Sequence, residues 1–177
     1  MQDYNTLVID FPWNIPLTAS NLLRRPNTAK NLPYKTMDLI EIENFYKFIN
    51  EKAADGAHLY FWATNRTLPI LFKLIDKWGY KYHLTLCWLK PSGIAPAMGY
   101  VFGSEFLVLC FKNSPRQKFL KIGILNWLIK KTPAGHHSEK PEEFYNKIAE
   151  MSPAPRLDIF ARRKISGFDG WGDEYPA

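Results

Sequence analysis

The sequence has 177 residues, the usual length of one domain, so we expect residues 1–177 to form a single domain. Lys and Arg number 23 against 17 Asp and Glu, a formal charge of +6; the 46% hydrophobic and 23% charged shares exclude a disordered, collagenous or coiled-coil chain. Cys87 and Cys110 lie in apolar runs without a CxxC partner, which predicts a soluble protein of the reducing cytoplasm. The sequence shows no signal peptide and no apolar run near the ~18 residues that span a bilayer, so no membrane association is expected.

Basic side chains are concentrated in two segments that contain no acid. Residues 14–37 hold four Lys and Arg side chains, and residues 106–138 hold six. Basic loops on an otherwise balanced body are typical of proteins that bind a polyanion such as nucleic acid. A solvated basic surface without a partner is the alternative.

The predicted elements alternate between strand and helix. The apolar runs predict buried strands at 4–10, 57–63, 82–89, 105–111 and 156–161, with room for a short strand within 112–137. Capping residues and helical spacing predict three helices. The first begins at Asp38, which forms a capping box with Glu41. The second begins at Asn65 or Thr67 and ends at Gly79, and the third begins at Ser138 and ends near Met151.

This alternation predicts an α/β fold with helices around a mostly parallel sheet. Ligands of such sheets bind at the carboxyl ends of the strands. We therefore expect the segments that follow Asp10, Thr64, Leu89, Phe111 and Ala161 to line the site.

The sharpest local motif is Asp10-Phe11-Pro12-Trp13, directly after the first predicted strand. An exocyclic amine on a base is a poor nucleophile because its lone pair is delocalised into the ring. Acceptors on its two N–H bonds improve it, and Asp10 with the Pro12 carbonyl would supply them. Trp13 would stack on the extruded base, a contact worth ~1–3 kcal/mol. A strand-ending turn with a core tryptophan is the alternative interpretation.

The same motif resembles the D-P-P-W signature of the adenine amino-methyltransferases related to the catalytic subunit of the eukaryotic messenger-RNA adenosine methyltransferase. Further pieces follow in that family's order: Leu32 to Met37, Leu59 to Asn65, Gly79-Tyr80 with Cys87 to Lys90, Ser138 to Tyr145, Ser152-Pro153 with Arg156 to Arg162, and Trp171 to Glu174. The resemblance implies a Rossmann-like methyltransferase fold that uses S-adenosyl-L-methionine. It also implies methyl transfer to the adenine N6 of DNA, as in compact microbial members in the cytoplasm of a cell or of a phage's host.

The resemblance also implies roles for individual residues. Lys140, with Ser138 beside it, would hold the cofactor's carboxylate, and Asp10 and Pro12 would contact the cofactor as well as the target amine. Arg162 would approach the cofactor, and Asp173 and Glu174 would lie near its ribose and adenine. Phe11, Tyr34 and Lys35 would contact the substrate.

Three features depart from the family or leave alternatives open. Phe11 replaces the motif's first proline, Asp173 replaces an asparagine, and few residues precede the first strand, so the adenine end of the pocket would be open or closed by a partner. RNA is an alternative substrate to DNA. A non-catalytic scaffold and a small-molecule amine methyltransferase are alternatives to an enzyme that acts on nucleic acid. The oligomeric state also stays open, with a homodimer or a heterodimer as options. His136, His137 and Glu139 lack the spacing of a metal site, so no metal is expected.

Overall fold

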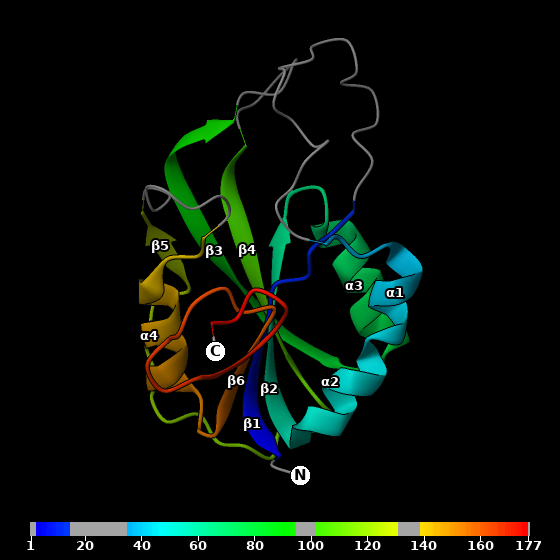
Figure 1. Cartoon of the computed structure of the whole chain (residues 1–177). Coiled ribbons are helices and arrows are strands. Elements are labelled where there is room, and N and C mark those ends of the chain that lie inside the picture. The colour runs from blue at the N-terminus through cyan, green and yellow to red at the C-terminus, as the bar shows by residue number, and fades with distance from the viewer. Residues whose placement is uncertain (1–2, 15–34, 95–101, 131–138, 177) are drawn as a thin grey trace.

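The computed structural model describes residues 3–14, 35–94, 102–130 and 139–176, and a seven-stranded sheet forms its centre (Figure 1). The strands lie in the order β5-β3-β4-β2-β1-β6-β7. Their bounds are β1 Tyr4–Ile9, β2 Ala53–Thr64, β3 Lys81–Ile94, β4 Phe102–Phe111, β5 Trp127–Ile129, β6 Arg156–Ile159 and β7 Asp169–Trp171.

Every pairing in this sheet is parallel except the two made by β4, which runs antiparallel to β2 and β3. The α/β fold with a mostly parallel sheet is therefore confirmed. The direction of β4 corrects one expectation: the residues directly after Phe111 leave the sheet at the edge opposite the ends of β1 and β2, so they do not lie beside Asp10. The start of β4, by contrast, lies beside the end of β2, where Glu105 pairs with Thr64.

Helices cover both faces of the sheet. The helices α1 Leu39–Asn44, α2 Tyr46–Lys52 and α3 Leu68–Lys77 lie on one face, and α4 Glu142–Met151 lies on the other (Figure 1). Strand β1 shows how the core divides, because Leu7 and Ile9 point into the cluster under α1 to α3 while Val8 joins the cluster under α4. All three are fully buried, which explains why β1 is a continuous apolar run in the sequence.

The helix signals of the sequence are confirmed in part. Asp38 and Glu41 form the reciprocal capping box at α1, and Gly79 follows α3 with a φ of +73°, which favours glycine. Helix α4 begins later than expected, since Pro141 occupies its N-cap position and Glu142 is its first residue.

Two differences from the predicted elements reflect tertiary contacts. Strand β2 begins at Ala53, immediately after α2, because its first residues pair with β1. Strand β7 was not predicted, since its three residues, Asp169–Trp171, carry little apolar pattern and gain their strand conformation by pairing with β6. Among the described residues, no helix has the length and apolar character needed to cross a bilayer.

The capping box gives a stability prediction. Asp38→Ala removes the acceptor of the Glu41 backbone N–H, a hydrogen bond of 2.8 Å, and should lower the free energy of unfolding by about 1 kcal/mol. Urea denaturation measures this change. Asp76→Ala, at an exposed position inside α3, is the control and should change stability by less than about 0.5 kcal/mol. Equal losses in the two variants would contradict a capping role.

Candidate active site

A buried ion pair joins the end of β1 to the residue two positions before α4. Lys140 Nζ lies 2.8 Å from Asp10 Oδ2, although 130 positions separate the two residues in the sequence. The Lys140 side chain is 9% exposed and that of Asp10 is 24% exposed. The structure therefore brings together the acid of the motif and the lysine for which the sequence predicted a cofactor role.

Two further charged side chains extend this pair into an alternating series. Glu105, at the start of β4, places Oε2 3.5 Å from Lys140 Nζ, and its other oxygen, Oε1, accepts a hydrogen bond from Lys90. Lys90 Nζ also lies over the Trp88 ring, 4.3 Å from its centroid. The sequence predicted no role for Glu105 or Lys90. The available signal was the position of each charge at the end of an apolar strand that faces the predicted site.

The charges in this series stabilise one another. Burial alone would lower the pKa of Lys140, but Asp10 and Glu105 outweigh it and raise that pKa, so Lys140 stays protonated. Burial alone would raise the pKa of the Glu105 carboxyl. The positive charges of Lys140 and Lys90 outweigh burial, so the pKa of Glu105 is lowered. The site therefore presents a fixed ammonium beside a carboxylate.

Aromatic packing holds the motif loop in place. The Phe11 ring is 3% exposed and has ring centroids within 6.3 Å on all sides, those of Trp13, Phe45, Phe61, Trp78 and Phe160. This packing anchors the two neighbours of Phe11, Asp10 and Pro12, in the core, and the substrate contact expected of Phe11 stays a prediction.

The backbone of the motif is bonded to the segment before α1. The Pro12 carbonyl accepts a hydrogen bond of 2.8 Å from the Met37 N–H, and Asn14 N–H donates to the Met37 carbonyl. A carbonyl oxygen has two lone pairs, so Pro12 keeps one for another donor. Trp13 is half-buried, and its Nε1 has no hydrogen-bond partner within the part of the chain that the structure describes.

The residues predicted for the far end of the cofactor lie at the same edge of the sheet. Arg162 follows β6 and its Nε lies 3.1 Å from Glu174 Oε2, while Asp173 is exposed just after β7. Because β6 pairs with β1 and β7 pairs with β6, these residues follow strands that run parallel to β1. Lys35 is exposed, and the predicted residues Tyr34 and Ser138 lie outside the described residues.

Most of the described basic side chains of the second segment pair with acids from other elements or donate hydrogen bonds to backbone carbonyls. Arg116 pairs with Asp55 at 2.7 Å, Lys121 with Glu150 at 3.0 Å, and Lys130 with Glu143. Lys112 Nζ donates to the backbone carbonyls of Asn50 and Ala53. The absence of acids along this segment therefore overstated its free positive charge, and Arg116 lies at the edge of the sheet away from Asp10 because Asp55 is near the start of β2.

A buried acid lies behind the ion pair. Asp158, on β6, is 5% exposed and accepts a hydrogen bond of 3.1 Å from the Tyr145 hydroxyl on α4. Burial raises the pKa of Asp158 to about 7, the Tyr145 hydrogen bond opposes this, and the Asp10 carboxylate adds to it. The protonation of Asp158 therefore changes near neutral pH.

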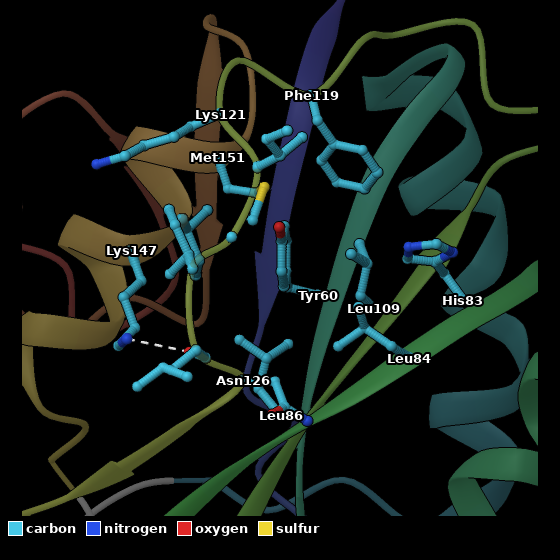
Figure 2. Close-up of a pocket in the computed structure, with 15 residues that line it drawn as sticks. Tyr60, His83, Leu84, Leu86, Leu109, Phe119, Lys121, Asn126, Lys147 and Met151 are labelled. Atoms are coloured by element: carbon cyan, nitrogen blue, oxygen red, sulfur yellow. Dashed lines mark hydrogen bonds between the residues drawn. The ribbon is translucent and has the colours of Figure 1, made fainter.

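A separate pocket of about 270 Å³ lies between the sheet, α4 and residues 119–126. Figure 2 shows that Leu84, Leu86, Leu109 and Phe119 face into it. None of the residues that line it is an acid, so it offers no carboxylate to pair with an ammonium group. In the described ranges, no group of three or more His, Cys, Asp or Glu side chains could hold a metal ion, and His136 and His137 lie outside those ranges.

The mostly parallel sheet with flanking helices is a Rossmann-like methyltransferase fold. A model of the MT-A70 family matches residues 4–174, and the chain belongs to this family.

Two relatives agree with the family assignment. The type II methyltransferase M.MunI of Mycoplasma sp is 26% identical over 159 residues, which are 84% of this chain and 63% of that protein. A putative N(6)-adenosine-methyltransferase MT-A70-like protein of Medicago truncatula is 23% identical over 169 residues, which are 90% of this chain and 24% of that protein. The chain thus spans less than two thirds of the length of either relative.

The raised pKa of Asp158 predicts how stability depends on pH. An acid whose pKa is higher in the folded than in the unfolded state binds more protons when folded, so its contribution to stability falls as pH rises between the two values. From the ordinary value of 3.8 to about 7, this loss amounts to roughly 4 kcal/mol. Asp158→Asn keeps an acceptor for Tyr145 and should abolish the loss. Urea denaturation from pH 4 to 8 measures it, and parallel profiles for the two proteins would contradict the assignment.

Proposed function

We propose that this chain transfers a methyl group from S-adenosyl-L-methionine to the exocyclic N6 amine of adenine in DNA. The observation that carries the proposal is the buried pair of Lys140 and Asp10 at the carboxyl end of β1. An ammonium and a carboxylate held side by side match the two charged ends of an amino acid.

The residues present fit the methionine end of this cofactor. Lys140 would hold its carboxylate and Asp10 its ammonium, so each charge of the buried pair would gain a new partner of opposite sign. Such contacts are strong here because both side chains are largely withdrawn from water. Arg162, Asp173 and Glu174 would lie toward the ribose and adenine. When bound, S-adenosyl-L-methionine supplies an electrophilic methyl group on a sulfonium.

The motif residues would act on the target base. Asp10 and the free lone pair of the Pro12 carbonyl would accept the two N–H bonds of the amine and direct its lone pair at the methyl group. Trp13 would hold the extruded base by stacking. The Phe11 anchor and the Met37 hydrogen bond keep both acceptors fixed before substrate arrives, and such positioning is a major source of rate enhancement.

Adenine as the target is supported by the family and by the name of the Medicago truncatula relative. DNA is preferred over RNA because the chain resembles compact microbial members of the family. The decisive experiment incubates the protein with labelled S-adenosyl-L-methionine and defined DNA or RNA, digests the product to nucleosides and identifies the methylated one. Labelled N6-methyladenosine from RNA alone would overturn the choice of DNA, and absence of any methylated nucleoside would overturn the proposal.

Loss of the acceptor should abolish turnover. We expect Asp10→Ala and Asp10→Asn to lower kcat by at least about 100-fold, since each removes a preorganised charged group from the reacting centre. Methyl incorporation into DNA measures the effect, and circular dichroism checks the fold. Asp55→Ala, an acid at the opposite edge of the sheet, is the matched control and should keep full activity. Normal turnover by Asp10→Ala would contradict the acceptor role.

Nucleic-acid binding should depend on salt, although the neutralised side chains of residues 112–130 reduce the number of phosphate contacts expected. Each cation that contacts a phosphate releases counterions, so the logarithm of the association constant should fall linearly with the logarithm of the salt concentration. Fluorescence anisotropy with labelled duplex DNA at several salt concentrations measures the slope. An affinity indifferent to salt would count against a nucleic-acid partner.

A further inference from the structure

The turn that carries Lys140 is held by one guanidinium from the segment after β6. Arg163 Nη2 donates to the Lys140 carbonyl oxygen at 3.2 Å. Arg163 Nη1 lies 3.1 Å from Glu139 Oε1 and 3.7 Å from Glu142 Oε2. A single side chain therefore contacts Lys140 itself, Glu139 directly before it and Glu142 two positions after it.

These contacts matter because Lys140 lies outside regular structure. Helix α4 begins only at Glu142, so Lys140 precedes the first helical residue and its N-cap. A lysine side chain is a flexible four-carbon stem that ends in an ammonium group. The Lys140 ammonium therefore has a defined position beside Asp10 only if the Lys140 backbone is itself fixed. The Arg163 contacts supply that restraint from the segment that directly follows β6, and β6 pairs with β1, the strand that ends beside Asp10.

The neighbouring arginine takes a different direction. Arg162 pairs with Glu174 in the C-terminal segment, whereas Arg163 pairs with the turn before α4. The family resemblance implies a cofactor role for Arg162 and none for Arg163.

We propose that Arg163 is a positioning residue, which fixes the turn at Glu139 to Glu142 so that the Lys140 ammonium faces Asp10 and the cofactor's carboxylate. The inference rests on the proposed function, in which Lys140 binds that carboxylate. A planar guanidinium can reach three oxygens at once, whereas a lysine ammonium at this position is a point charge on a flexible stem. The role therefore depends on the shape of the group as well as on its charge.

The test compares two ligands that differ only in the carboxylate. Calorimetry gives the Kd of S-adenosyl-L-methionine and of decarboxylated S-adenosylmethionine for the whole chain. We expect Arg163→Ala to weaken binding of the first by about tenfold, the factor that matches one charge-assisted hydrogen bond, and to leave the second nearly unchanged. The Arg163→Lys variant should bind S-adenosyl-L-methionine about as weakly as Arg163→Ala does. If the alanine variant does not fold, the same comparison is made with Arg163→Lys. Arg116→Ala, which breaks an Arg–Asp pair at the far edge of the sheet, is the control and should alter neither Kd.

A double-mutant cycle separates this inference from the proposed function. Lys140→Gln should weaken the binding of S-adenosyl-L-methionine and leave that of the decarboxylated ligand nearly unchanged. Adding Arg163→Ala to Lys140→Gln should weaken binding little further, because the two residues act on one contact. If Lys140→Gln leaves the ratio of the two Kd values unchanged, the carboxylate role of Lys140 is wrong. If Lys140→Gln changes the ratio but Arg163→Ala does not, or if Arg163→Lys restores full affinity, the positioning role of Arg163 alone is wrong.

Discussion

The buried contact between Lys140 and Asp10 is the interaction on which the site depends. Removing two charges from water is costly, and the attraction between them compensates only when geometry and further partners are favourable. Here Glu105 and Lys90 provide those partners, so the series contains two acids and two bases and carries no net charge. This balance lets the protein keep an ammonium and a carboxylate adjacent and largely shielded from water.

The motif loop shows how packing replaces a covalent restraint. A proline at position 11 would fix φ and stiffen the loop through its ring. Phe11 instead inserts among five aromatic rings, and the restraint comes from the core under α1 to α3. The acceptors on either side of Phe11 are therefore coupled to the stability of that core, which includes residues as distant in sequence as Phe160.

The charges that neighbour a segment in the folded structure differ from those that neighbour it in the sequence. Residues 106–138 contain only basic charges along the chain, yet Asp55, Glu143 and Glu150 approach from other elements and pair with them. Conversely, Glu105 is an isolated acid at a strand end in the sequence and becomes the link between two lysines in the fold. A count of charges within a segment predicts surface potential only where no other segment folds against it.

The sequence alone determined the alternation of strands and helices, the capping box at Asp38, the position of Asp10 at a strand end and, by resemblance, the family. These features follow from local patterns: apolar runs, capping side chains and short motifs whose residues are neighbours along the chain. The tertiary structure decided the reversed direction of β4, the strand conformation of β7, the burial of Phe11 and the meeting of Asp10, Glu105, Lys140 and Arg163. Each of these depends on contacts between segments far apart in sequence, and their free energy resides in pairing and desolvation that no local pattern encodes.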